Sequence, residues 1–187
     1  MPHISIISSG VRAGRKSQSV SLYFQNYLSN NNLATTEILD LKKYGFPVFK
    51  NIIKTQNEPL DKVLIFANKV KSSDGIIIVT PECNGYYPPS LKNVVELLYD
   101  EWHTKPISIC TVSAGAFGGA QALVLLQFTL WEIGAWTVTN MFCVSNVAKT
   151  FDDMGNPSDG VVTDKLADAF IKELLGCVKI NKQAAIA

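Results

Sequence analysis

The sequence predicts an α/β fold in which helices cover both faces of a doubly wound parallel sheet of five strands, with the strand order 2-1-3-4-5. Short β-branched runs alternate five times with segments of helical periodicity, which is the pattern of right-handed βαβ units. Two runs, Ile76–Val79 and Ile107–Val112, are apolar without alternation, as expected for strands covered on both faces. The length of 187 residues suits a single core, so we expect one domain over residues 1–187.

The expected elements follow one another in a regular order. Ile4–Ile7 has the composition of a buried first strand, and Ser8-Ser9-Gly10 closes it with a turn. Ser17–Leu28 places apolar residues near helical spacing after serines that suit the N-cap, and Thr35–Leu41 is rich in strand-forming residues. The tail Lys182–Ala187 looks frayed. The remaining expected elements are a helix over 59–71, a strand over 76–79, a helix over 91–102, a strand over 107–112, a helix over 120–133, a strand over 136–144 and a helix over 162–175.

Charge and cysteine usage exclude several classes of function. Lys and Arg number 17 and Asp and Glu 16, so there is no field of one sign to attract nucleic acid or an anionic membrane. The chain enters its first strand without a secretory signal, and we expect a cytoplasmic location. The cysteines lie far apart without a C-x-x-C pair, so neither a metal site nor a disulfide framework is predicted. They are Cys83, Cys110, Cys143 and Cys177.

One stretch resembles a membrane span in its charge alone. Between Gly115 and Val144 the only formal charge is Glu132. Glycine, glutamine and asparagine residues interrupt this stretch, and no uninterrupted apolar run approaches the roughly 18 residues that a span requires. We therefore expect no membrane insertion.

Three loops should form the binding site, because ligands of such sheets bind beyond the carboxyl ends of the strands, where the strand order reverses. The first loop, residues 8–19, carries hydroxyls, glycines and cations and opens a helix whose free N–H groups attract an anion, so we expect a phosphate there. It is not a Walker loop, because Arg15 stands where glycine must precede Lys16, and Gly10 and Gly14 do not fit the dinucleotide fingerprint. The alternative is a solvated basic turn.

The other two loops suit a flat ring. Residues 80–90 contain three prolines and the pair Asn84-Gly85, which fix the backbone direction and permit positive φ, so this loop could read the edge of a heterocycle. The loop over 113–119 offers small residues that let a ring approach the backbone, with Phe117 as a lid. The alternatives are an ordinary turn for the former and tight packing of helix on strand for the latter.

These motifs are similar to those of a known family. They are Ser9-Gly10-Val11-Arg12 with Gly14-Arg15-Lys16-Ser17, the run from Thr80-Pro81-Glu82-Cys83-Asn84-Gly85 to Leu91-Lys92-Asn93, and Ser113-Ala114-Gly115-Ala116-Phe117-Gly118-Gly119. With them the chain resembles the NADPH-dependent FMN reductases, a flavodoxin-like group that includes soluble quinone, chromate and azo-dye reductases. The resemblance covers nearly the whole chain and implies a flavodoxin-like fold, FMN as the cofactor and NADPH or NADH as the electron donor.

The resemblance also implies roles for individual residues. The phosphate of FMN would bind to Ser9, Arg12, Ser17, Gln18 and Ser19. Because a guanidinium group matches phosphate geometry, Arg12 and Arg15 are both candidates for the phosphate of FMN or the 2′-phosphate of NADPH. The isoalloxazine would lie against Pro81, Glu82, Cys83 and Asn84, with the backbone N–H groups from Glu82 to Gly85 at its edge and Ser113 and Gly115 on its other side.

The chain departs from the family pattern at two positions. The family usually has Gly-Ser where this sequence has Ser9-Gly10, which moves one hydroxyl by a single residue. It usually has tyrosine where this sequence has Cys83, so a thiol takes the place of a large ring beside the flavin. The thiol is either an inert small residue or one that changes stacking, substrate access or oligomer contacts.

By the same resemblance the chain is an enzyme without a catalytic side chain of its own. The flavin accepts hydride from NAD(P)H and passes electrons to a small acceptor: a quinone, a flavin, chromate or an azo compound. Two alternatives stay open, a flavodoxin-type electron carrier and a redox-sensing interaction module. We also expect a homodimer or tetramer, because the helix over 91–102 has more apolar side chains than one sheet face needs. The alternative is that the monomer buries this helix by itself.

Overall fold

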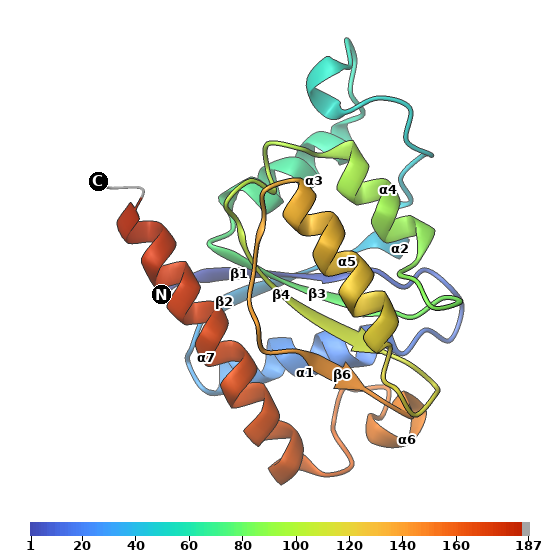
Figure 1. Cartoon of the computed structure of the whole chain (residues 1–187), viewed down its shortest axis with the longest axis vertical. Helices are drawn as coiled ribbons and strands as arrows, with labels where there is room; N and C mark the ends of the chain where they lie inside the picture. Colours follow the sequence, from blue (N-terminus) through green and yellow to red (C-terminus); the bar gives the residue numbers. More distant parts are fainter. Residues whose placement is uncertain (185–187) are drawn as a thin grey trace.

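The computed structural model in Figure 1 describes residues 1–184 and contains one parallel sheet with helices on both faces. The sheet order is β2-β1-β3-β4-β5, and β6 also pairs with β4. The predicted α/β class and strand order are confirmed. The strands are β1 (His3–Ser8), β2 (Thr35–Asp40), β3 (Gly75–Pro81), β4 (Pro106–Val112), β5 (Trp136–Thr137) and β6 (Phe142–Val144). The helices are α1 (Ser17–Asn30), α2 (Leu41–Tyr44), α3 (Asp61–Ser72), α4 (Pro89–Leu97), α5 (Ala120–Glu132), α6 (Val147–Thr150) and α7 (Gly160–Ala184), with a 3₁₀ turn, η1 (Ile53–Thr55).

The apolar runs form the central strands because both faces of the sheet are covered. In β3, Ile77 and Val79 point to a core shared with α1 and α7, whereas Ile76 and Ile78 point to a second core shared with α3, α4 and α5. All four side chains are fully buried. The carboxyl ends of β1, β3 and β4 therefore meet at one edge, where the loops that follow them are collected.

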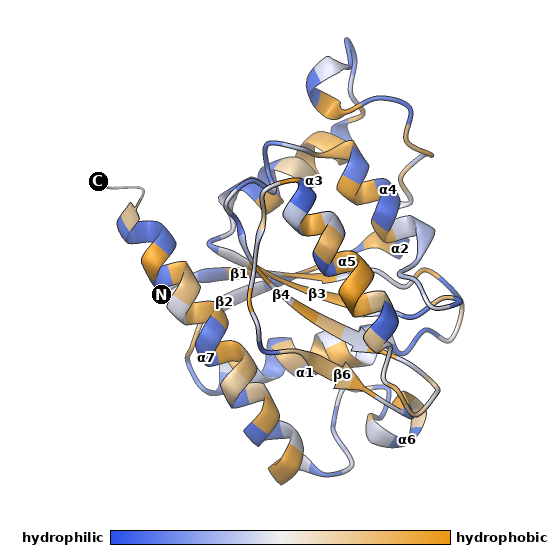
Figure 2. Cartoon of the chain, in the orientation of Figure 1, coloured by the Kyte–Doolittle hydropathy of each residue, from blue (hydrophilic) through white to orange (hydrophobic). Residues whose placement is uncertain are grey.

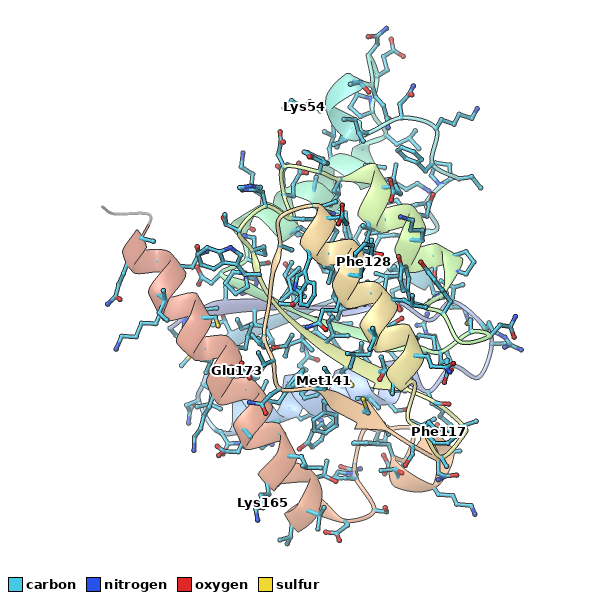
Figure 3. All side chains as sticks on the ribbon, in the orientation of Figure 1. Lys54, Phe117, Phe128, Met141, Lys165 and Glu173 are labelled. Atoms are coloured by element: carbon cyan, nitrogen blue, oxygen red, sulfur yellow. The ribbon has the colours of Figure 1, made fainter. Side chains whose placement is uncertain are left out.

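The predicted strand over 136–144 is interrupted. Thr137 pairs with Ile107 and Phe142 pairs with Cys110, so the register against β4 moves by two residues across 138–141. The carboxylate of Glu173 accepts the N–H groups of Thr139 and Asn140, at 2.8 and 2.7 Å. A side chain of α7 thus accepts the N–H groups that a neighbouring strand would otherwise bind. The strand at this edge of the sheet bulges at this point. Figure 3 labels Glu173 on α7 and Met141 in the interrupted segment.

Helix α7 is longer than its sequence pattern predicts. It runs to Ala184 instead of ending near Leu175, so the expected fraying is wrong for residues 182–184, and residues 185–187 lie outside the described part of the chain. The ammonium group of Lys182 binds the carboxylate of Asp74 at 2.7 Å, which fastens the last turns to the start of β3. Within residues 1–184, no helix combines the length and the apolar character needed to cross a membrane.

The apolar side chains of the predicted helix over 91–102 do not form an outer face, so the reason for expecting a dimer contact there does not hold. They are buried within the monomer, and the indole N–H of Trp102 donates to the carbonyl of Val95 at 3.2 Å. Tyr99 is the exception and is exposed. Exposed apolar side chains gather on α5 instead, and Figure 2 shows much of that helix in orange. They are Val124, Leu125, Phe128 and Trp131, joined by Trp136 and Met141 beyond the helix.

Candidate functional site

A cleft of about 480 Å³ lies at the carboxyl ends of β1 and β3. The first and second predicted loops form its two walls, so segments about 70 residues apart in the sequence face each other across it. Of the residues assigned to the site by resemblance, Arg12, Pro81, Glu82 and Cys83 line this cleft. The full lining is Gly10, Val11, Arg12, Ala13, Gly14, Arg15, Lys16, Pro81, Glu82, Cys83, Pro88, Pro89 and Ser90.

Unpartnered polar groups lie at the base of the first loop. The hydroxyls of Ser9 and Ser17 are buried and have no hydrogen-bond partner among the described residues, and the same holds for Ser8 at the end of β1. Lys16 is the N-cap residue of α1, and its side chain does not cap the helix. The first N–H groups of α1 therefore have no side-chain acceptor from the N-cap. A Cβ at Gly10 would lie 2.4 Å from the Ser17 hydroxyl. Any residue other than glycine at this position would therefore displace the hydroxyl. Free hydroxyls at a helix N-terminus fit a phosphate group.

The two arginines of the first loop have different roles. Arg15 donates to the carbonyl of Gly10 at 2.9 Å and to the carboxylate of Asp40 at 2.6 Å, and the two ionic side chains are only 14% and 4% exposed. Arg15 therefore has a structural role, because it fixes the loop to the end of β2. Lys16 is likewise paired, with Asp153 at 2.6 Å. Arg12 is exposed and has no ion pair within residues 1–184, so it is the cation of this loop that an anion can approach.

The loop after β3 contains a tight two-residue turn. Cys83 donates its N–H to the carbonyl of Tyr86 at 2.6 Å, and Tyr86 donates back to Cys83 at 3.0 Å. Asn84 and Gly85 between them have φ of 53° and 78°, the left-handed pair of a type I′ turn, which explains the Asn-Gly sequence. Glu82 donates its N–H to Val112 at 3.1 Å. The expectation that all four N–H groups face the ligand is therefore wrong, because those of Glu82 and Cys83 are used within the protein.

The third loop lies beside the second but does not line the cleft. The hydroxyl of Ser113 accepts the N–H of Gly115 at 3.0 Å, and the backbone of Ser113 bonds to Val144 at 2.9 Å, so this loop is held by β6 and α6. A Cβ at Gly119 would lie 3.4 Å from the Cβ of Glu82, which places the two loops in contact. Phe117 is 88% exposed at the outer end of the loop and does not cover the cleft (Figure 3).

Several residues that support the site have no signal in their own sequence neighbourhood. Ser90, at the start of α4, donates to the carbonyl of Ser9 at 2.7 Å and so joins the two walls. Tyr87 is buried behind the turn with its hydroxyl 2.9 Å from that of Thr129, and burial raises its pKa to about 12. Asp40 could have been suspected, since it ends β2 beside the first loop. Asp153 could not have been suspected, because no sequence pattern indicates an ion pair with Lys16, 137 residues away.

The remaining predicted residues surround the cleft without lining it. Gln18 lies on the first turn of α1 with its amide oxygen 3.5 Å from the guanidinium of Arg15, and Ser19 is buried on the same turn. Asn84 is exposed at the tip of the turn, and a Cβ at Gly85 would lie 3.0 Å from the amide oxygen of Gln121. The second loop therefore also contacts α5.

Comparison with known proteins agrees with this geometry. The family described as NADPH-dependent FMN reductase matches residues 2–149. An NAD(P)H-dependent FMN reductase of Saccharomyces cerevisiae is 30% identical over 140 residues, covering 68% of this chain and 72% of the relative. A quinone reductase of Pseudomonas putida is 27% identical over 157 residues, covering 80% of each. The solved structure of the flavoenzyme NAD(P)H:(acceptor) oxidoreductase of Paracoccus denitrificans superposes with a TM-score of 0.80 at 18% identity, over 94% of this chain and 98% of that one. The chain belongs to the NADPH-dependent FMN reductase family.

Proposed function

We propose that the chain is an FMN-dependent NAD(P)H oxidoreductase that delivers electrons to a small acceptor such as a quinone. The observation that supports this most is the pair of buried, unpartnered hydroxyls of Ser9 and Ser17, at the two ends of the loop that forms one wall of the cleft, with a rigid turn in the opposite wall. FMN has both groups that such a site fits, a phosphate and a flat ring. When bound, the flavin supplies two-electron redox chemistry, so the chain needs no nucleophile or metal of its own.

The residues of the first loop would bind the phosphate. Ser9, Ser17 and Ser19 would donate hydroxyl hydrogen bonds, and the free N–H groups of α1 would add to them. Arg12 would supply the positive charge, because Arg15 is neutralised by Asp40. Gln18, on the same turn of the helix, would complete this set together with the backbone of the loop.

The second loop would hold the ring. Pro81, Glu82 and Cys83 line the cleft and would contact the isoalloxazine. The N–H groups of Asn84 and Gly85 have no backbone acceptor among the described residues and would donate to its polar edge. Because the type I′ turn fixes these groups in advance, little entropy would be lost when the isoalloxazine is oriented. Ser113 and Gly115 belong to the loop next to this wall and would close the site on that side.

A second copy of the chain would cover the exposed face of α5. That face contains Phe128 and Trp131 among several aliphatic side chains, and aromatic residues are enriched at the centres of protein interfaces. Since Gly85 contacts Gln121 on the same helix, a partner seated there would lie beside the ring-binding turn. Sedimentation of the wild-type protein should show a dimer or a larger oligomer, and Phe128→Glu should shift it towards the monomer.

We also propose that the protein works in a reducing cytoplasm. Its cysteines are free thiols in the described structure, at positions from the buried Cys110 to the exposed Cys143. Burial raises the pKa of Cys110, which keeps that thiol protonated and inert.

Turnover by the flavin-loaded protein tests the proposed function. The purified protein should bind FMN with a yellow spectrum, NADPH should bleach that spectrum, and a quinone should restore it through many cycles. An electron carrier would bind FMN without consuming NADPH. The proposal is wrong if FMN-loaded protein oxidises neither NADPH nor NADH in the presence of a quinone. Arg12→Ala should weaken FMN binding about ten-fold, as expected for loss of one charge-assisted contact.

A further inference from the structure

A second cavity, of about 340 Å³, adjoins the cleft on the side of β2 and α2. Val11 and Ser90 line both cavities, so the two cavities are neighbours with part of their walls in common. The complete lining of the second cavity is Val11, Leu41, Lys42, Gly45, Phe46, Ser90 and Asn93. A ligand that extends out of the cleft past Ser90 would enter it.

The walls of this cavity are held by specific hydrogen bonds. The side chain of Asn93 uses both ends of its amide: it accepts the N–H of Phe49 at 2.6 Å and donates to the carbonyl of Pro47 at 2.8 Å. Lys62 donates to the carbonyl of Gly45 at 2.6 Å. The N–H of Lys42 is bound by the Asp40 carboxylate at 3.0 Å. The cavity is therefore preformed, and the same Asp40 that holds the phosphate-binding loop also holds the backbone of Lys42.

The charge of the cavity is positive. Lys42 is the one ionisable side chain among the described residues that line it, and it forms no ion pair within residues 1–184. Of the three cations in the first loop, Arg15 and Lys16 are paired with Asp40 and Asp153, and the unpaired Arg12 is the one assigned above to the phosphate of FMN. Phe46 adds an aromatic ring that stacks on Tyr44, with centroids 5.1 Å apart. A free ammonium beside an aromatic wall suits a phosphorylated nucleoside better than a neutral acceptor.

We propose that this cavity binds the 2′-phosphate of NADPH and that Lys42 determines the preference for NADPH over NADH. The inference rests on the proposed function. The phosphate of FMN already has a site at the start of α1, so the cation in the adjoining cavity is available to the other phosphorylated ligand of the reaction. NADH lacks the 2′-phosphate and gains nothing from Lys42.

Two variants on the same short helix test the proposal. Lys42→Ala should lower kcat/KM for NADPH relative to kcat/KM for NADH by about ten-fold, as expected for loss of one charge-assisted contact to a phosphate. Lys43→Ala removes the adjacent exposed cation, which does not line the cavity, and should leave that ratio unchanged. Calorimetric titration with 2′,5′-ADP gives a readout without turnover: Lys42→Ala should weaken its binding by a similar factor, and Lys43→Ala should not.

Other results would overturn the proposal. Equal losses for NADPH and NADH in Lys42→Ala would mean that Lys42 contacts a part common to both nucleotides. Weaker FMN binding in Lys42→Ala, with 2′,5′-ADP binding unchanged, would place the lysine at the cofactor instead. If the wild-type protein oxidised neither nucleotide, the proposed function would fail, and the titration with 2′,5′-ADP would still decide whether the cavity binds a 2′-phosphate.

Discussion

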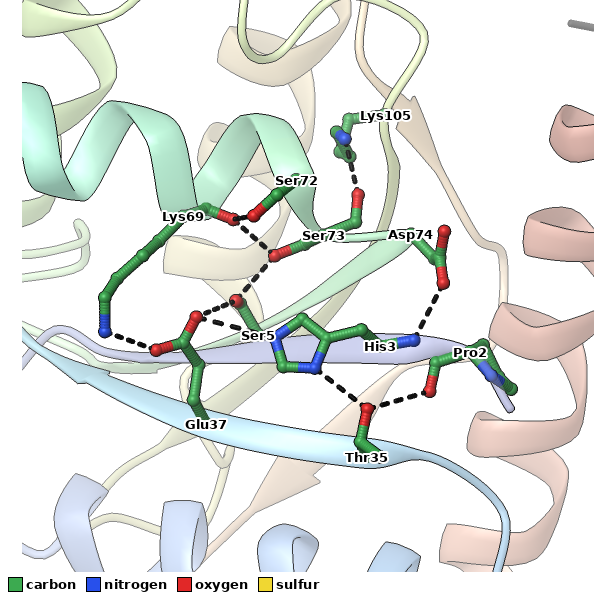
Figure 4. Close-up of polar contacts among 10 residues, drawn as sticks. All are labelled: Pro2, His3, Ser5, Thr35, Glu37, Lys69, Ser72, Ser73, Asp74 and Lys105. Atoms are coloured by element: carbon green, nitrogen blue, oxygen red, sulfur yellow. Dashed lines mark hydrogen bonds and ion pairs between the residues drawn. The ribbon is translucent and has the colours of Figure 1, made fainter.

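The two ends of the parallel sheet differ in how their polar groups are satisfied. At the amino-terminal end, the polar side chains drawn in Figure 4 are joined by hydrogen bonds and ion pairs. The carboxylate of Glu37 on β2 binds Lys69 from α3 at 2.5 Å and lies 3.4 Å from the imidazole of His3. The buried hydroxyls of Ser5 and Ser73 lie 2.6 Å apart. These contacts join β1, β2 and α3 at the end of the molecule away from the cleft.

The same network continues to the other side of the sheet. Asp74 accepts the N–H of His3 at 2.8 Å and the ammonium of Lys182 at 2.7 Å. Partial burial alone would raise the pKa of Asp74, but the hydrogen bonds from Lys182 and His3 hold it below its ordinary value. Lys105 donates to the carbonyl of Ser73 at 2.6 Å, and burial lowers its pKa. The amino-terminal end is thus a closed polar network.

At the carboxyl-terminal end of the sheet, several buried hydroxyls have no hydrogen-bond partner among the described residues. Ser8, Ser9 and Ser17 have no partner among the described residues, and the one further case, Ser108, lies within β4. A buried hydroxyl without a partner costs on the order of 1–3 kcal/mol, so a fold keeps several together only where something else can satisfy them. One end of the sheet thus satisfies its polar groups within the fold, whereas the other leaves buried hydroxyls that a ligand can satisfy.

Removal of one ionic partner at each end should give the largest contrast in stability. Asp40→Asn leaves Arg15 unpaired in a nearly buried position and should lower the free energy of unfolding by about 3 kcal/mol. Lys69→Met removes a partly exposed partner of Glu37 and should cost less than about 1 kcal/mol. Urea unfolding of both variants measures this. Equal costs would mean that burial does not distinguish the two ion pairs.

A methyl group at Gly10 should damage the binding end while the rest of the fold persists. The new Cβ would lie 2.4 Å from the Ser17 hydroxyl, and overpacking of this kind costs on the order of 2 kcal/mol, so Gly10→Ala should bind FMN about 30-fold more weakly. Gly176→Ala on α7 is the matched control, because a Cβ there meets no atom within 4 Å. Fluorescence titration of FMN is the measurement. Unchanged affinity in Gly10→Ala would show that the first loop does not hold the cofactor.

Serine-to-alanine changes at the two ends should have opposite consequences. Ser9→Ala or Ser17→Ala removes an unpartnered hydroxyl, so the FMN-free protein should keep its stability while FMN affinity falls about ten-fold. Ser5→Ala removes a hydroxyl that is already satisfied and should cost about 1 kcal/mol of stability without changing FMN affinity. Thermal unfolding and FMN titration of each variant separate the two effects. A stability loss in Ser9→Ala as large as in Ser5→Ala would contradict the comparison.

The smallest effect concerns Glu173 at the edge of the sheet. Partial burial alone would raise its pKa, but hydrogen bonds from Thr139 and Asn140 hold it below the ordinary value of 4.5. The carboxylate therefore stabilises the fold above about pH 4.5, and this stabilisation is lost as the pH falls through the lowered pKa of the folded state. Glu173→Gln should be less stable than wild type by about 1 kcal/mol at pH 7, with the difference shrinking towards pH 3. A difference that did not change with pH would exclude this role.

Much of the fold could be predicted because its determinants are local. The run Ile76–Val79 needs two covered faces wherever it lies, and the pair Asn84-Gly85 suits a turn with positive φ in any context. The break in the last strand could not be predicted, because the acceptor of its N–H groups is Glu173, more than 30 residues further along the chain. The burial of Trp102 likewise depends on packing between α4 and its neighbours.

The candidate site divides in the same way. The sequence by itself determined the class of fold and the three loops at one edge of the sheet, and it predicts an anion at the first loop, because hydrophobic period, turn residues and helix termini act over a few residues. Tertiary structure alone decided that Arg15 is paired with Asp40 while Arg12 is open, and that Lys42 lines a cavity next to the cleft. Those outcomes depend on Asp40, Ser90 and Asn93, which reach the site from other elements, and pairing over such distances leaves no local pattern.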